Sequence, residues 1–211
     1  MQGWIPPLPV ALGMAALGFS WIVLFGAARD GVPVGLTLPA LGWVHLVALG
    51  WITLVALSIL LHVIPAFLGV EWRSRSLARA ATLVFAAGAG TLVVGFSASN
   101  LATLQAGAWI TLPALLIYTI AACEPLFEAI RRKGTARAVA RAFGTTLVLL
   151  LITAALGFSF ALALTGGAPA TLLQQLPKAH ALLGIVGWLS LLVAGVSART
   201  MGPIAGEAHG T

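Results

Sequence analysis

The sequence predicts an all-α integral membrane protein, a bundle of six transmembrane helices forming a single domain over residues 1–211. Hydrophobic residues make up 60% of the chain and charged residues 8%, whereas an ordinary soluble domain has about 25% charged residues. The apolar residues also form continuous runs that are long enough for helices crossing about 30 Å of hydrocarbon. These runs are rich in Leu and Ala, which favours helices over the alternating strands of a membrane barrel.

Six apolar runs define the expected helices in chain order. We place the helices at residues 6–28, 37–65, 78–98, 104–128, 139–166 and 178–201. The first run ends at Arg29 and Asp30, and the second is followed by a basic linker. The linker between the third and fourth runs has no charged residue, the next linker is again basic, and the last contains Lys178. We therefore expect the lipid bilayer to be the main partner of the chain.

The distribution of basic residues predicts the orientation. The linker after the second helix contains Arg73, Arg75 and Arg79, and the linker after the fourth contains five basic residues between positions 131 and 141. Basic linkers stay in the cytoplasm, so both termini are expected to be cytoplasmic, as in a multi-pass protein of a prokaryotic-type inner membrane. The net charge of +6 thus reflects topology and does not indicate nucleic-acid binding.

A repeat indicates three helical hairpins. Residues 15–20 and residues 154–159 share the string Ala-Ala-Leu-Gly-Phe-Ser, and the third helix contains the shorter Gly95-Phe96-Ser97. The even-numbered helices share a second marker, a small residue followed by Trp and, further on, by Pro. This marker starts at Gly50, Ala108 and Gly187. We therefore expect a parallel pseudo-repeat about an axis along the membrane normal.

Two histidines are the first candidates for a cofactor site. His45 precedes Trp51 by six residues and His180 precedes Trp188 by eight, so with the Gly-Trp pairs aligned their depths differ by about 3 Å. Two imidazoles at matching depth on different helices are what an axially ligated haem iron needs. The alternative is that both are helix-end histidines bonded to backbone carbonyls or water.

A third histidine, His62, belongs to a separate site. It follows His45 by 17 residues, about 25 Å along a helix, and therefore cannot bind the same metal ion. With Cys123 and Met201 it forms a set of soft ligands suited to copper. The alternative is an interfacial histidine, a buried thiol and a packed thioether.

Two segments resemble a known family. Residues 43–51 and 62–65 of the second helix resemble the His-x-His helix of heme-copper oxidase subunit I, particularly of the C-type oxidases and nitric oxide reductases. Residues 180–188 resemble the same motif, and the NnrS family of haem- and copper-containing membrane proteins has similar segments. By this resemblance His180 takes the position that binds the high-spin haem and His45 the position that binds the low-spin haem. Trp43 and Leu182 stand at the other two positions.

The resemblance implies a reduced relative of these oxidases. The oxidases need further histidines for copper and for a second axial ligand, whereas this chain has four histidines, with His209 near the end of the sequence. We expect haem b, because the covalent attachment motif Cys-x-x-Cys-His does not occur in the sequence. The candidate donors to its propionates are Arg29, Lys178, Trp43 and Gln174.

The expected function is electron transfer or the binding or sensing of a gas such as nitric oxide or oxygen, with a respiratory-chain partner and without enzymatic activity of its own. The alternatives are a small membrane transporter or a non-catalytic assembly subunit of a respiratory complex. The sequence shows no phosphate-binding loop and no nucleophile with a base, which argues against a hydrolase or kinase. The small-residue face over residues 86–90 is a candidate contact within the chain or in a homo-oligomer.

Overall fold

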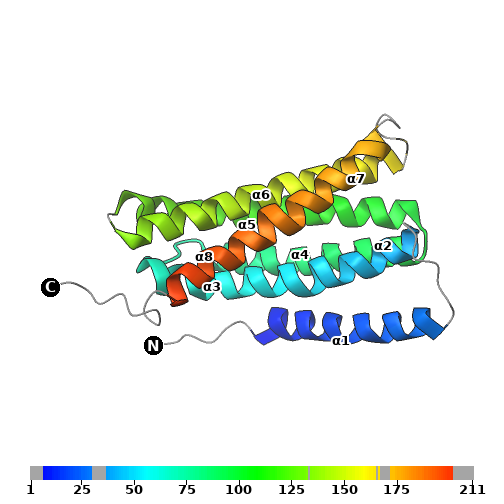
Figure 1. Ribbon diagram of the computed structural model, residues 1–211, viewed down its shortest axis with the longest axis horizontal. Helices are drawn as coiled ribbons and strands as arrows, with labels where there is room; N and C mark the ends of the chain where they lie inside the picture. Colours follow the sequence, from blue (N-terminus) through cyan, green and yellow to red (C-terminus); the bar gives the residue numbers. More distant parts are fainter. Residues whose placement is uncertain (1–6, 30–36, 133, 165, 167–171, 202–211) are drawn as a thin grey trace.

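A computed structural model describes residues 7–29, 37–132, 134–164, 166 and 172–201, and these residues form helices and short turns without a strand (Figure 1). The helices form six rods. Four rods are single helices, namely α1 (Pro7–Arg29), α4 (Arg75–Ser97), α5 (Leu101–Arg131) and α6 (Thr135–Leu164). The second rod joins α2 (Leu38–His45), the π-helix η1 (Leu46–Thr53) and α3 (Leu54–Leu68). The sixth rod joins α7 (Leu172–Leu182), the π-helix η2 (Leu183–Leu189) and α8 (Ser190–Met201).

The predicted all-α class is confirmed for the described residues, and the rods have the properties of a multi-pass membrane protein. Five helices are long and apolar enough to cross a membrane by their length and composition, and they correspond to the second through sixth rods. The described part of α1 contributes a shorter apolar stretch, Leu8–Leu24. The predicted count of six spans therefore depends on α1.

Several rods extend beyond the predicted ends, and in the second and sixth rods the extension places a proline inside the helix. Pro65 was expected to end the second helix, but α3 continues to Leu68 and Gly69 then caps it, with φ of 64° and its N–H bonded to the Pro65 carbonyl. The left-handed conformation at such a cap is one that glycine adopts without steric cost. Pro177 lies within α7, which begins at Leu172. Membrane bundles tolerate proline in helices because neighbouring groups satisfy the freed backbone.

The core lies between α3, α4, α5 and α6. Leu57, Phe85, Leu115 and Phe143 are at most 1% exposed. Tyr118, also 1% exposed, donates its hydroxyl proton to the Leu57 carbonyl at 2.8 Å, which ties α5 to α3. Since each side chain of this group fills space between two or more rods, the four helices form one packed unit.

Glycines bring α4 and α5 together more closely than any side chain would allow. A methyl group at Gly95 would collide with the backbone of Leu104, and one at Gly107 would collide with the backbone of Leu92. Gly88, in the predicted small-residue face, would place a methyl group 2.7 Å from the Thr111 hydroxyl. That part of the face is therefore a contact within the chain, whereas a methyl group at Gly90 would meet no atom within 4 Å.

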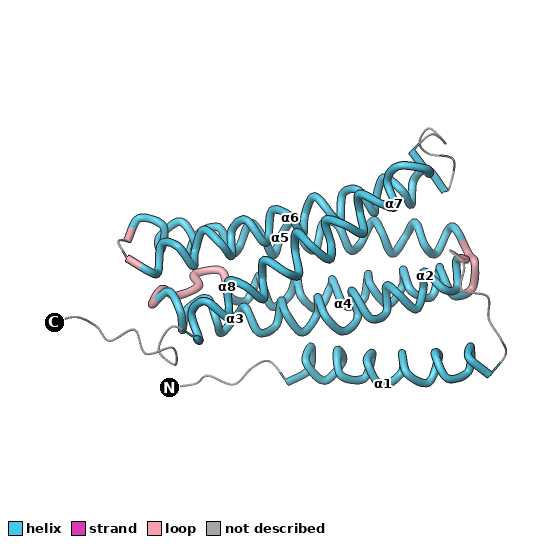
Figure 2. The backbone as a smooth tube through the Cα atoms, viewed as in Figure 1, coloured by secondary structure: helices cyan, strands magenta, loops and turns pink. Residues whose placement is uncertain are grey.

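The two basic linkers lie at the same end of the bundle. Figure 2 shows the loops that follow α3 and α5 at one end and the loop that follows α4 at the other. Arg132, directly after α5, donates to the Gly69 carbonyl at 2.8 Å, and Arg73 forms a 2.7 Å ion pair with Glu124. This placement agrees with the positive-inside pattern of the sequence, and the assignment of this end to the cytoplasm stays a prediction.

The close approach of α4 and α5 predicts a large effect of a small substitution. We expect Gly95→Ala to lower the free energy of unfolding by about 1–3 kcal/mol, because the backbone at Leu104 must move to admit the methyl group. Gly90→Ala on the same helix is the matched control and is expected to change it by less than about 0.5 kcal/mol. Denaturation in detergent measures both, and equal stability of the two variants would contradict the packing described.

Candidate functional site

The candidate site is built where α2 packs on α4 and where α7 packs on α6. A methyl group at Gly42 of α2 would lie 2.8 Å from the Ser97 hydroxyl oxygen and 3.1 Å from Cβ of Phe96 on α4. The absence of a side chain at position 42 lets α2 lie directly on the end of α4. His45 follows one turn later and is the last residue of α2.

The His45 ring is held in a defined orientation. Its Nδ1 lies 2.7 Å from the carbonyl oxygen of Leu41, one turn earlier on the same helix. Its ring stacks on Phe96, with the centroids 4.7 Å apart and the planes inclined by 27°. A carbonyl oxygen only accepts, so Nδ1 carries the proton and the Nε2 lone pair is available.

The His180 ring is held in the same way by a different helix. Its Nδ1 lies 2.8 Å from the carbonyl oxygen of Thr153 on α6. The ring lies against Gly157, where a methyl group would come within 2.8 Å of the ring carbon Cε1 and 3.1 Å of Nδ1. The donated Nδ1 proton again leaves the Nε2 lone pair available.

The structure brings these two predicted residues together. The ring centroids of His45 and His180 are 6.0 Å apart, and the ring planes are inclined by 14°. Both rings are half-buried. The matching depth expected from the sequence is therefore accompanied by a contact between the rings.

The separation fits two imidazoles that share one metal ion. A metal–nitrogen bond is about 2 Å long, and the ring centre lies about 1 Å beyond the nitrogen. Two imidazoles on opposite sides of one metal ion therefore have their ring centroids about 6 Å apart. Metal-ligating histidines also donate their other N–H to a carbonyl or carboxylate, which fixes the tautomer. His45 and His180 meet the second condition, and their centroid separation of 6.0 Å agrees with the first, so these two residues are the ones that would hold a haem iron.

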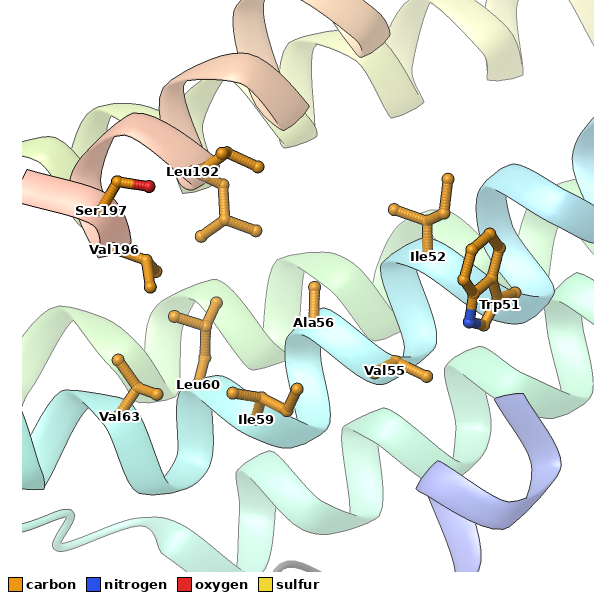
Figure 3. A pocket seen from close by; sticks show the side chains of 11 residues that line it. Trp51, Ile52, Val55, Ala56, Ile59, Leu60, Val63, Leu192, Val196 and Ser197 are labelled. Carbon is orange, nitrogen blue, oxygen red and sulfur yellow. The ribbon is translucent and has the colours of Figure 1, made fainter. Parts of the chain in front are cut away.

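An apolar groove of about 370 Å³ separates the same two rods beyond the histidines (Figure 3). It begins at Trp51, six residues after His45, and continues towards the end with the basic linkers. Side chains of η1 and α3 form one wall and side chains of α8 form the other. The lining residues are Trp51, Ile52, Val55, Ala56, Ile59, Leu60, Val63, Leu192, Val193, Val196 and Ser197. The space between these rods is thus suited to an apolar group.

The predicted propionate donors differ in what they contact. The Trp43 indole donates to the Ser20 carbonyl at 3.0 Å and so ties α2 to α1. Lys178 is exposed on α7, two residues before His180. Arg29 ends α1 and Gln174 lies in the first turns of α7, and the side chains of both lie outside the described residues. Of the two donors whose side chains are described, Lys178 is exposed and Trp43 is half-buried.

The third histidine is part of a different arrangement. His62 receives a hydrogen bond at Nε2 from Arg75 at 3.0 Å, and its Nδ1 lies 3.4 Å from the Ser58 carbonyl. Both ring nitrogens of His62 thus have a neighbour in this arrangement, and the copper site stays a prediction. Cys123 is half-buried on α5, and the side chain of Met201 lies outside the described residues. Within the described residues no group of three or more His, Cys, Asp or Glu side chains could hold a metal ion.

Five contributors to the site were not among the residues that the sequence analysis proposed for it, namely Gly42, Phe96, Gly157 and the backbone carbonyls of Leu41 and Thr153. Phe96 and Gly157 both belong to the repeated Gly-Phe-Ser strings, so the repeat itself was the signal for them. Thr153 contributes its backbone carbonyl, for which no sequence signal exists because every residue has one. Sequence patterns can therefore indicate the residues that pack against the histidine rings, but they do not indicate which carbonyl accepts the histidine proton.

Comparison of the chain with models of known protein families, with curated proteins and with solved structures found no match in any of the three.

The Nδ1 bonds of the histidine pair predict the tautomer of both rings. We expect the metal-free protein, labelled with ¹⁵N-histidine and reconstituted in lipid, to show a protonated Nδ1 and an unprotonated Nε2 at His45 and His180. Solid-state ¹⁵N NMR distinguishes the two nitrogens, and His45→Ala and His180→Ala assign the signals. A proton on Nε2 of either ring would show that the carbonyl bonds do not form.

Proposed function

We propose that this chain is a multi-pass membrane protein that binds haem b between His45 and His180 and transfers electrons. The observation that carries the proposal is the pair of nearly parallel imidazoles, with centroids 6.0 Å apart and with each Nδ1 bonded to a carbonyl. His45 and His180 would hold the iron, and the space between their rods is apolar where the groove begins at Trp51.

Haem supplies one-electron redox chemistry when bound, and the protein determines how it is used. Two histidines bound to the iron would leave no free position for nitric oxide or oxygen, which favours electron transfer over gas binding. The carbonyls of Leu41 and Thr153 hold the rings by their Nδ1 protons, which raises the basicity of Nε2. The half-buried position of both rings limits access of water to the metal.

We further propose six spans in a prokaryotic-type inner membrane, with both termini and both basic linkers in the cytoplasm. In this orientation the histidine pair lies towards the outer leaflet, because α2 and α7, which contain the histidines, are the parts of their rods away from the basic linkers. Lys178, exposed at that end, is the proposed donor to a propionate. The electron partner is then a component of the respiratory chain that reaches the outer half of the membrane.

Single substitutions of the two ligands test the proposal. We expect His45→Ala and His180→Ala each to weaken haem binding by about 100-fold or more, since loss of a ligand exceeds the 10–100-fold cost of losing its support. Absorption spectra of purified, haem-reconstituted protein report the Soret band, and His209→Ala is the matched control. A Soret band that survives both substitutions would refute the proposal. Purified protein that takes up no haem would also refute the proposal. The alternatives would then be a membrane transporter or a non-catalytic assembly subunit.

The contact of Gly157 with His180 gives a second, more graded test. In Gly157→Ala the added methyl group displaces the ring from the Thr153 carbonyl, and we expect haem affinity to fall about tenfold. Gly144→Ala on the same helix is the control, since a methyl group there would meet no atom within 4 Å. Haem titration of both variants measures the effect. Equal affinities for the two variants would show that the ring position at Gly157 does not matter for binding.

A further inference from the structure

The two rods that hold the histidines share an interruption that the other rods lack in the described part of the chain. The π-helix η1 (Leu46–Thr53) begins directly after His45, and the π-helix η2 (Leu183–Leu189) begins three residues after His180. Both contain the Gly-Trp pair. π-Helices are rare and occur mostly as single turns inside α-helices, frequently at functional sites. Two of them at equivalent positions therefore call for a physical reason.

The direction of His45 supplies such a reason for η1. Leu54, Leu57 and Leu61 mark the buried face of α3. In an unbroken α-helix the nine steps from Leu54 back to His45 amount to about 900°, which places His45 about half a turn away from that face. An ideal π-helix advances by about 82° per residue instead of about 100°, so over the eight residues of η1 the expected change in the direction of His45 is about 145°. The π-helix thus turns His45 from the lipid side to the interior.

The same reasoning applies to His180. Leu192 marks the buried face of α8, at 8% exposure. In an unbroken α-helix the twelve steps from Leu192 back to His180 would leave the two side chains pointing about 120° apart. An ideal π twist over the seven residues of η2 changes the direction of His180 by about 125°, which nearly cancels this offset. Each π-helix therefore compensates for the offset of its own histidine, and the rings meet at 6.0 Å.

A hydroxyl closes each π turn. Thr53 donates its side-chain proton to the Ala48 carbonyl at 2.8 Å, and Ser190 donates to the Ile185 carbonyl at 3.0 Å. Both bonds reach five residues back, and both residues follow a tryptophan by two positions. Thr111 follows Trp109 by two positions in α5, which has neither π turn nor histidine, and its hydroxyl bonds the Gly107 carbonyl four residues back.

We propose that Thr53 and Ser190 are positioning residues, whose hydroxyls hold the two π turns and thereby aim His45 and His180 at a shared metal ion. This inference rests on the proposed function where haem binding is measured. A second test, which measures only how close positions 45 and 180 lie, does not depend on haem. A hydroxyl bonded five residues back stabilises the wide turn, whereas an α turn offers the same hydroxyl a carbonyl four residues back. The proposal requires the bond five residues back to be stronger than the bond that an α turn offers, and on this premise loss of the hydroxyl favours the α-helical register, in which the histidine points away.

The first test measures haem binding. We expect Thr53→Val and Ser190→Ala each to weaken haem binding about fivefold, and the double variant about 25-fold, with loss of the spectrum typical of two axial histidines. Thr53→Ser and Ser190→Thr keep the hydroxyl and should restore both affinity and spectrum. Thr111→Val is the matched control. If the hydroxyl-free variants bind haem as tightly as Thr111→Val and give its spectrum, the proposal is wrong.

The second test needs no haem. In a Cys123→Ser background, His45→Cys and His180→Cys together place two thiols at the site, and a short dimaleimide should cross-link them within one chain. Adding Thr53→Val and Ser190→Ala should slow this cross-linking about fivefold, and adding Thr111→Val should not, as measured by mass spectrometry. An unchanged rate overturns the positioning role. Protein that fails to bind haem but shows the expected slowing would reject the proposed function and retain this inference.

Discussion

Backbone hydrogen bonding in an apolar solvent is the constraint on which the rest of this structure depends. In lipid each N–H and C=O must find its partner within the bundle, which restricts the described chain to helical rods. A carbonyl oxygen has two lone pairs, so Leu41 and Thr153 can each accept a histidine proton while remaining in their helices. The protein can therefore orient two imidazoles without placing a buried charge beside them, which in a membrane would be costly.

Close approach between rods makes this arrangement possible. Gly42 lets α2 lie on the end of α4, where Phe96 stacks on His45, and Gly157 lets the His180 ring lie against α6. Both contacts involve a helix that belongs to the packed core and a helix that carries one of the two proposed ligands. The rigid part of the bundle thus determines the ring positions, while the apolar groove remains between the second and sixth rods.

Much of the fold could be predicted from the sequence because burial in lipid demands continuous apolar runs, and the six runs correspond to the six rods. The helix ends were less predictable. Pro65 and Pro177 end helices in soluble proteins, but here both lie inside helices, because a rod held by its neighbours tolerates the loss of one backbone bond. The contacts of α4 with α5 were foreseen only as a face of small residues, since sequence does not say which helix fills such a face.

The sequence by itself determined the class of the protein, its apolar rods and the matching depths of His45 and His180, because hydropathy and rise per residue are local properties. Tertiary structure decided the directions in which those histidines point. The direction of a side chain about the helix axis depends on the twist of every residue between it and the buried face. A single π-helix changes this direction by more than a quarter of a turn. That turn depends on where Thr53 and Ser190 find a carbonyl, and composition and spacing do not specify this.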